Sequence, residues 1–232
     1  MGVFLAVSGW LGLARAQPSA NQGFGATTLG GAGTPTVRVT TLADAGKGSL
    51  REALRRGNRT IVFEVAGEIA LSTHIYVGGP FVTIDGLSAP PPGITLRGHG
   101  LIIRGNRGSH DVIVRGIRVR DSAIDGIQVA YSAYNVVIDR VSVAGASDGN
   151  IDITESHDVT VSWSIVGNNK KSMLIKYRPS RITLHHNLLV GSLERSPQVR
   201  IDDTETGAAT ETTAQSVLSN HTRPGSAPVG PV

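Results

Sequence analysis

Three aspartates close together in the chain are the first side chains that could do chemistry as a group: Asp139, Asp148 and Asp152. Three carboxylates that converge within one turn of chain form a hard-oxygen site suited to Ca²⁺, with water or a substrate carboxylate filling the remaining positions. Asp148 precedes a glycine, and an Asp-Gly pair is usually an ordinary turn. Asp152 has no turn role, because a carboxylate inside the run Ile-Asp-Ile must face outward from a strand.

Basic side chains follow the acids at the same spacing. The residues in register are Asp125, Asp148, Lys171 and Arg195, separated by 23, 23 and 24 residues. If each interval is one turn of a solenoid, these side chains form one column with a step of about 4.8 Å. Two acids beside two bases predict a cleft with a cation-binding half and an anion-binding half. Solvated charges on an exposed sheet are the alternative interpretation.

Two consecutive histidines, His185 and His186, are further candidates for a base or a ligand. Consecutive residues of a strand point to opposite faces, so we expect that the two rings cannot act together. We therefore interpret both as structural.

The elements that must position these side chains are short apolar strands that recur at a near-constant interval. Four of them begin at Val112, Val136, Val159 and Ile182, so their starts are separated by 24, 23 and 23 residues. A fixed period in this range is typical of a repeat architecture. The repeats are rich in β-branched residues and contain no window suited to a helix, which favours a parallel β-helix in which one repeat is one turn.

One short helix is predicted before the repeats. Ser49 is a suitable N-cap, Glu52 completes a capping box, and Gly57 ends the pattern. Its natural role is to cover the open N-terminal end of the solenoid, because terminal units must shield the core from water. The glycine-rich stretch at residues 22–33 has no strand before it and no helix after it, so we interpret it as turns and not as a dinucleotide-binding fingerprint.

The two ends of the chain differ from the middle. Residues 1–16 resemble a secretory signal with an apolar run and the small-residue site Ala14-Arg15-Ala16, although a mis-assigned start is an alternative. Residues 17–203 are predicted to form the β-helix domain. Residues 204–232 are rich in Thr, Ala, Ser, Gly and Pro, which predicts a disordered tail.

Composition narrows the possible partners. The net charge is +4, without a Lys/Arg run or interleaved aromatic residues, which favours an acidic substrate over nucleic acid. The absence of cysteine excludes disulfides and thiolate metal sites. The sequence contains no apolar stretch of membrane-spanning length. We expect a secreted monomer.

Several motifs occur in an order that identifies a family resemblance. They are Gly48–Leu54, Ile61–Gly67, Ile138-Asp139, Ser147–Thr154, Val159–Ser164, Lys171–Ile175, Leu184–Asn187 and Arg195–Arg200. Together they resemble the pectate lyases of polysaccharide lyase family one. The resemblance covers roughly residues 22–203 in one order, so it is far more specific than any single motif.

The resemblance implies a right-handed, single-stranded parallel β-helix that cleaves α-1,4-linked polygalacturonate, an acidic plant cell-wall polysaccharide. The implied reaction is calcium-assisted β-elimination, in which a base removes the acidified C5 proton and the C4 oxygen leaves. The implied roles are calcium binding by Asp139, Asp148 and Asp152, catalysis by Arg195 as the base, and binding of substrate carboxylates by Lys171 and Arg200.

Two departures from the family pattern keep other functions open. Arg140 stands where members usually have histidine, and members usually continue for several turns beyond the Arg195–Arg200 motif, where this chain has the predicted tail. A degenerate or non-catalytic carbohydrate-binding β-helix is therefore one alternative. A galacturonan hydrolase is another, but its two carboxylates would leave Arg195 and Lys171 without a role.

Overall fold

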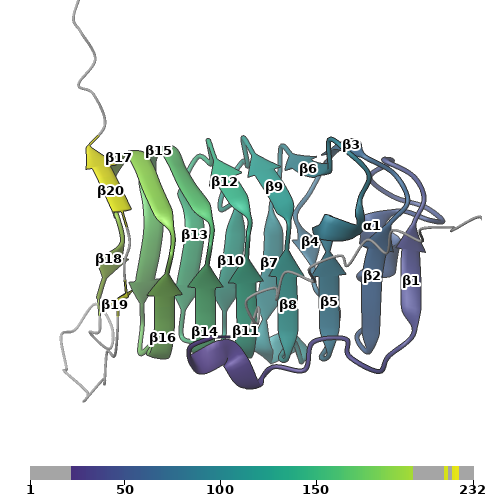
Figure 1. Ribbon diagram of the computed structural model, residues 1–232, viewed down its shortest axis with the longest axis horizontal. Helices are drawn as coiled ribbons and strands as arrows, with labels where there is room; N and C mark the ends of the chain where they lie inside the picture. Colours follow the sequence, from purple (N-terminus) through teal and green to yellow (C-terminus); the bar gives the residue numbers. More distant parts are fainter. Residues whose placement is uncertain (1–21, 201–216, 219–220, 225–232) are drawn as a thin grey trace, which may run out of the picture.

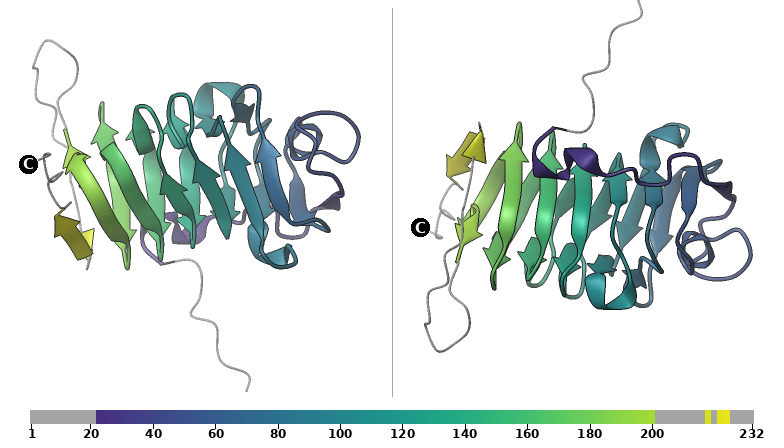
Figure 2. Two further views of the ribbon diagram at one scale, coloured as in Figure 1. Left: turned by 90° about the horizontal axis from the view of Figure 1, so that it is seen from above. Right: turned by 90° about the horizontal axis from the view of Figure 1, so that it is seen from below.

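A computed structural model describes residues 22–200, 217–218 and 221–224. Its strands stack along one axis as a parallel solenoid (Figures 1 and 2). Every strand pairing between successive turns is parallel within the described residues. The predicted all-β parallel β-helix is therefore confirmed.

The solenoid has three faces, which we call the first, second and third face. The first face is the eight-stranded sheet β1 (Thr36–Val39), β2 (Arg59–Phe63), β5 (Val82–Asp85), β8 (Val112–Arg115), β11 (Tyr134–Asp139), β14 (His157–Ser162), β16 (Ser180–His185) and β19 (Val217–Leu218). The second face contains β3 (Gly67–Ala70), β6 (Ile94–Arg97), β9 (Ile117–Arg120), β12 (Ser142–Ala144), the first part of β15 (Ile165–Lys176), β17 (Leu188–Glu194) and β20 (His221–Pro224). The third face contains β4 (Ile75–Tyr76), β7 (Leu101–Arg104), β10 (Ile127–Ala130), β13 (Gly149–Thr154), the second part of β15, and β18 (Gln198–Val199).

Stacked apolar side chains fill the space between the faces. On the first face Val114, Ile138, Val161 and Leu184 occupy equivalent positions of successive strands, and each is at most 2% exposed. Such a column repeats every strand spacing of about 4.8 Å, so a β-branched or leucine side chain always meets a similar neighbour above and below. This stacking is the physical reason for the constant repeat length in the sequence.

Corners with left-handed backbone set where one face ends and the next begins. Asp111, Asn135, Asp158 and Arg181 stand at equivalent corners with φ between 51° and 55°. Arg140, Trp163 and His186 form a second set with φ between 51° and 53°. A single residue in this conformation turns the chain sharply, which lets each turn bend without a long loop.

A strap formed by residues 22–35 crosses the outer side of the first face (Figures 1 and 2, purple). It includes the 3₁₀ turn η1 (Phe24–Thr27), and its backbone is held by threonines of successive strands: Phe24 N donates to Thr183 Oγ1 at 3.1 Å and Gly31 N to Thr83 Oγ1 at 2.8 Å. A Cβ on Gly31 would lie 2.3 Å from the carbonyl oxygen of Arg59. The glycines therefore permit close approach to the sheet, in addition to the turns predicted from sequence.

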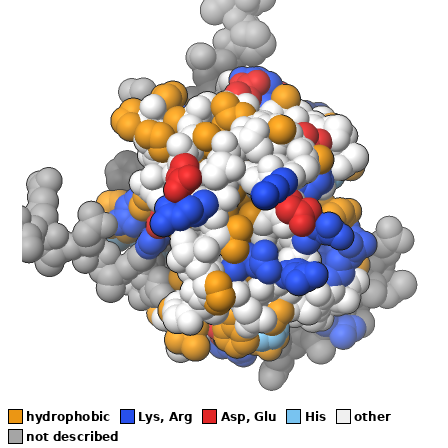
Figure 3. All heavy atoms as spheres, turned by 90° about the vertical axis from the view of Figure 1, so that its right-hand side faces the viewer, with side chains coloured by type: hydrophobic (Ala, Val, Ile, Leu, Met, Phe, Trp, Pro, Cys, Tyr) orange, Lys and Arg blue, Asp and Glu red, His pale blue; other side chains and the backbone are white. Residues whose placement is uncertain are grey.

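The predicted helix is a single turn, α1 (Leu50–Ala53), and ends before Gly57. Ser49 Oγ accepts a hydrogen bond from the backbone N–H of Glu52 at 3.2 Å, as the capping box predicts. Leu50 and Leu54 are buried in the core. Figure 3 looks onto the nearby N-terminal end, where Lys and Arg side chains gather beside scattered acids. Whether α1 covers this end stays a prediction.

Two short strands lie within the predicted tail. In the described residues β19 pairs with β16 and β20 pairs with β17, where the sequence indicated no strand rhythm. The other tail residues and the predicted signal at residues 1–16 lie outside the described residues.

No helix in the described part of the chain is long and apolar enough to cross a membrane. Two more 3₁₀ turns, η2 (Gly86–Ser88) and η3 (Gly105–Arg107), follow strands β5 and β7.

Candidate functional site

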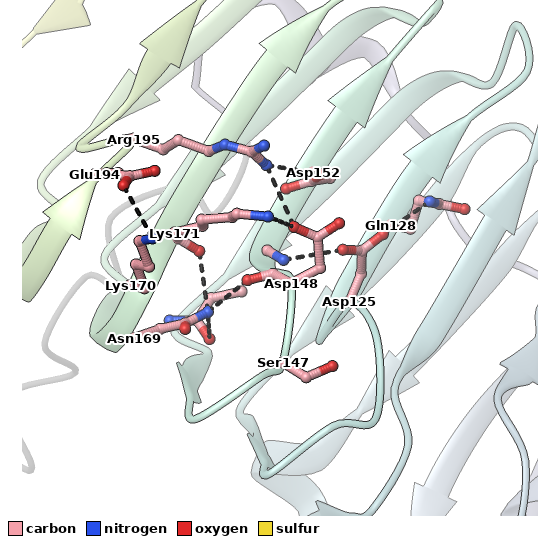
Figure 4. Close-up of polar contacts among 12 residues, drawn as sticks. Asp125, Gln128, Ser147, Asp148, Asp152, Asn169, Lys170, Lys171, Glu194 and Arg195 are labelled. Carbon is pink, nitrogen blue, oxygen red and sulfur yellow. Dashed lines mark hydrogen bonds and ion pairs between the residues drawn. The ribbon is translucent and has the colours of Figure 1, made fainter.

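The third face carries the predicted acids and bases, although the strand register places Asp148 one residue before the predicted column. Asp125 precedes β10, Asp148 precedes β13, Lys171 lies in β15, and Arg195 lies between β17 and β18. Gly149 pairs with Lys171 in the strand register, and Met173 N donates to Arg195 O at 2.7 Å. The side chains converge on one patch of the outer surface (Figure 4).

Asp148 and Asp152 hold the two bases by ion pairs. Lys171 Nζ lies 2.8 Å from Asp148 Oδ1. Arg195 Nη1 lies 3.6 Å from the same oxygen and 3.9 Å from Asp152 Oδ2. The Arg195 side chain is only 19% exposed, so its guanidinium is placed firmly beside the carboxylates. The predicted juxtaposition of acid and base is thus present.

Among the acids of this group, Asp152 has the least favourable environment for an ionised carboxylate. Its side chain is 8% exposed and its Oδ1 atom is buried without a hydrogen-bond partner in the described residues. Burial raises the pKa of Asp152 to about 7, and the nearby charge of Asp125 adds to this effect while Arg195 opposes it. A Cβ on Gly149 would lie 1.9 Å from Asp152 Oδ1, so only glycine leaves room for this carboxylate.

Asp125 belongs to the same site. Its Oδ1 accepts from Gly149 N at 3.0 Å and its Oδ2 from Gln128 Nε2 at 2.9 Å. Burial raises the pKa of Asp125, and the charge of Asp148 contributes in the same direction. The sequence analysis placed Asp125 in the column but did not include it among the calcium ligands.

Asp139, by contrast, is not brought together with Asp148 and Asp152. It ends β11 on the first face, is fully buried, and accepts a hydrogen bond from Ser162 Oγ at 2.8 Å. The guanidinium of Arg140, the residue that replaces the family's usual histidine, forms an ion pair with it. The eight residues between Asp139 and Asp148 carry the chain around the corner to another face, so these two aspartates are close in sequence but lie on different faces.

The remaining predicted residues lie at different places. Arg200 follows β18, and its backbone N–H donates to Ile175 O at 2.8 Å, which places it at the edge of the third face.

His185 and His186 lie on the first face with their Nδ1 atoms 2.9 Å apart. The expectation that these rings point to opposite faces is wrong, because His186 stands at a left-handed corner with φ of 53°. They remain outside the cleft.

The cleft has a volume of about 380 Å³. Its lining includes the charged residues Asp125, Asp148, Asp152, Glu155, Lys176 and Arg195, and the apolar or aromatic residues Ile124, Tyr131, Leu174 and Tyr177. In the described residues no group of three or more His, Cys, Asp or Glu side chains is arranged so that it could hold a metal ion. Lys171 does not line the cleft, and it lies beside it through its ion pair with Asp148.

Comparison with known proteins shows which proteins this chain resembles in sequence. No protein-family model matches the chain. It is 35% identical over 188 residues to a probable pectate lyase C of Emericella nidulans, and 34% identical over 189 residues to one of Aspergillus terreus. Over most of its length, this chain is similar in sequence to probable pectate lyases. Each alignment covers 77% of this chain and 44% of the relative, so the chain spans less than half the length of the curated relatives it matches.

Solved structures agree with the fold. The cedar pollen allergen jun a 1 superposes with a TM-score of 0.66 at 25% identity, covering 77% of this chain and 60% of the allergen. A pectate lyase from Bacillus sp. N165, solved in complex with trigalacturonate, superposes with a TM-score of 0.60 at 20% identity, covering 77% of this chain and 64% of the lyase. At that identity the second match shows the fold alone. The resemblance to pectate lyases seen in the sequence motifs is confirmed.

Proposed function

We propose that this chain binds polygalacturonate in the cleft of the third face and cleaves it by β-elimination, with Arg195 as the base. The observation that carries the proposal is the placement of Arg195: its guanidinium is largely buried at the cleft, next to Lys171 and two carboxylates. The sequence similarity to probable pectate lyases supports the same reaction class. The relatives whose names suggest this activity are longer than the chain, so its activity is a proposal to be tested on the chain itself.

Each of the three cationic side chains has a distinct role in this reaction. Arg195, in its neutral form, takes the proton from C5 of a galacturonate ring. The electrons of the C5–H bond form the C4=C5 double bond of the unsaturated uronide, and the C4 glycosidic oxygen leaves and takes a proton from water. Lys171 binds a substrate carboxylate as a point charge, and Arg200 binds another at the edge of the face. These cations, of which Arg195 lines the cleft and Lys171 and Arg200 lie beside it, fit a polymer that carries one carboxylate on each ring.

The acidic half of the cleft fits calcium. Asp125, Asp148 and Asp152 supply carboxylate oxygens from adjacent turns, and the orphaned, buried Oδ1 of Asp152 is the kind of atom that a cation would satisfy. Burial, together with the charges of neighbouring carboxylates, raises the pKa values of Asp125 and Asp152, and a bound cation would offset both effects. Calcium held there would neutralise the substrate carboxylate and so acidify the C5 proton. This ligand set replaces Asp139 with Asp125.

Galacturonan hydrolysis is a second candidate function. It needs one protonated and one ionised carboxyl group, and Asp152, with a pKa of about 7, lies near Asp148 in the cleft. The two functions differ in their products. Hydrolysis adds water across the glycosidic bond and leaves no double bond.

The decisive experiment follows the ultraviolet absorbance of the unsaturated uronide released from polygalacturonate, with calcium and with a chelator. It compares the unaltered chain with Arg195→Ala and Arg195→Lys, each shown to be folded by circular dichroism. We expect calcium-dependent absorbance that both variants lose, because lysine keeps the charge but not the guanidinium. New reducing ends without absorbance would identify a hydrolase, and binding without either product would identify a binding protein.

We further propose that the protein acts outside the cell as a monomer and that α1 closes the N-terminal end of the core. The location of plant cell-wall substrate and the leader-like residues 1–16 support export. Burial of Leu50 and Leu54 supports the closing role of α1. Size-exclusion chromatography of the exported protein tests the oligomeric state.

A further inference from the structure

The outer surface of the third face continues beyond the cleft toward the N-terminus. In the strand register Tyr76 pairs with Ile102, Ile102 with Gln128, and Gln128 with Asp152. Arg104, at the end of β7, pairs with Ala130 of β10. The strands β4 and β7 therefore present the same face to solvent as the strands that carry the candidate site.

Two arginines and two tyrosines form a platform on this extension. The Arg104 guanidinium carbon lies 4.7 Å from the ring centre of Tyr131 and 5.3 Å from that of Tyr76, and the Arg107 guanidinium carbon lies 4.5 Å from the Tyr76 ring centre. Tyr76 is 36% exposed and Tyr131 is 43% exposed. Tyr131 also lines the cleft, so the platform and the cleft are continuous.

The two platform arginines lack the anionic partners that several other arginines of this protein have. Arg115 forms a two-pronged contact with Asp85 at 2.9 Å on each side, and Arg181 forms one with Asp158 at 2.6 Å. Arg104 has no hydrogen bond or ion pair from its side chain within the described residues, and its Nε atom is buried without a partner. Arg107 likewise has no such contact there.

A partly buried guanidinium without an anion is unfavourable unless a ligand supplies one. Stacking against tyrosine rings holds a planar guanidinium in a fixed orientation, and this fork matches a carboxylate with two parallel hydrogen bonds. Among the described residues, no arginine at the N-terminal end lies over a tyrosine ring in this way. There Arg55 pairs with Glu52, and Arg59 donates to the carbonyls of Ala53 and Gly57.

We propose that Tyr76, Arg104, Arg107 and Tyr131 form a second anion-binding subsite, which holds one carboxylate of an acidic polysaccharide while Lys171 and Arg195 hold another part of the same chain. The strand β7 lies two strands from β13, which is about 10 Å along the stacking direction. A polyuronate that lies along the solenoid axis therefore reaches both groups. The inference rests on the proposed substrate class, although it does not require cleavage.

The test measures the binding of hexagalacturonate, and of its neutral methyl ester, to the chain by isothermal titration calorimetry. It compares the unaltered chain with Arg104→Gln, Arg104→Lys and the matched control Arg118→Gln. Arg118 is an outward-facing arginine of β9 on the second face, where its Nε donates to Thr95 Oγ1 at 2.8 Å. Thermal denaturation confirms that each variant is folded.

We expect Arg104→Gln to weaken binding of the acidic oligomer about tenfold, since it removes a charge-assisted contact. Arg104→Lys should give an intermediate loss, and Arg118→Gln should change binding less than about twofold. The methyl ester should not distinguish the variants. Unchanged binding in folded Arg104→Gln, an equal loss in Arg118→Gln, an equal loss for the methyl ester, or no binding to the unaltered chain would each overturn the subsite.

The subsite and the proposed reaction fail in different ways. Binding that depends on Arg104 without any unsaturated product would remove the lyase function and leave the subsite. Elimination with the same KM in Arg104→Gln as in the unaltered chain would remove the subsite and leave the lyase function.

Discussion

Lys171 Nζ lies 2.8 Å from Asp148 Oδ1, so a base proposed to bind substrate is held by an acid proposed to bind calcium. The two residues lie on neighbouring turns, and the strand register places Lys171 beside Gly149. Lys171 therefore competes with the proposed calcium ion for the carboxylate of Asp148. When Lys171 is changed, we expect substrate binding to become weaker and calcium binding to become stronger.

Replacing Lys171 by glutamine should lower kcat/KM on polygalacturonate roughly 10- to 100-fold, because a charge-assisted contact to substrate is lost. The same change should strengthen calcium binding, because Asp148 loses its ion pair. Calorimetry with calcium alone separates the two effects. Weaker calcium binding in Lys171→Gln would contradict the competition between the two cations.

Asp125 and Asp139 should behave differently when each is changed to asparagine. Asp125→Asn should weaken calcium binding at least about tenfold, measured by calorimetry at a pH well above 7, where Asp152 is ionised. Asp139→Asn should leave calcium binding unchanged. It should instead reduce the free energy of unfolding by about 3 kcal/mol, because Arg140 and Ser162 lose a buried charged partner.

Denaturant unfolding of the same variants provides the control for stability. If calcium binding disappears in Asp139→Asn at temperatures where that variant is folded, the first-face aspartate is a ligand after all, and the assignment of Asp125 is wrong. The sequence-based ligand set would then be restored.

Gly149→Ala should damage the site more than the fold. The added Cβ would lie 1.9 Å from Asp152 Oδ1, and the side chain of Asp152 must move away. We expect loss of most calcium affinity, comparable with Asp152→Asn, and a decrease in the free energy of unfolding of about 1 kcal/mol. Retention of full calcium affinity in Gly149→Ala would show that the Asp152 carboxylate does not need its observed position.

The ion pair between Asp158 and Arg181 should make stability depend on pH. Hydrogen bonds from Arg181 lower the pKa of Asp158 below its usual 3.8. A carboxyl whose pKa is lowered by folding stabilises the protein at pH values above 3.8 and loses this contribution as the pH falls through the folded-state pKa. Asp158→Asn should thus reduce the free energy of unfolding by about 1 kcal/mol at neutral pH.

Urea unfolding of Asp158→Asn and the unaltered chain over a range of pH measures this effect. The difference between them should shrink at strongly acidic pH. His157, whose Nδ1 lies 2.7 Å from Asp158 Oδ2, is the other titratable group at this carboxylate, so His157→Gln serves as a control. A difference that stays constant down to strongly acidic pH would exclude the ion pair as its cause.

The sequence determined the architecture and most of the column. Apolar strands that start 24, 23 and 23 residues apart can bury their side chains only by stacking, and this fixes the register. The observed register pairs Lys171 with Gly149, so Asp148 lies one residue before the column, and its side chain still reaches Lys171 (Figure 4). The repeat spacing therefore predicted that these acids and bases lie close together, although the sequence did not show where each turn bends.

Only the tertiary structure decided which face each residue occupies within a turn. Asp139 is nine residues from Asp148 but lies on another face, whereas Asp125 is 23 residues away and lies in the same site. The cluster of Tyr76, Arg104 and Tyr131 likewise joins three separate turns. The physical reason is that a solenoid brings together residues one full turn apart, and left-handed corners set where each turn bends. Asp and Asn mark one set of corners at Asp111, Asn135 and Asp158, but Arg140 and Trp163 in the other set carry no such signal.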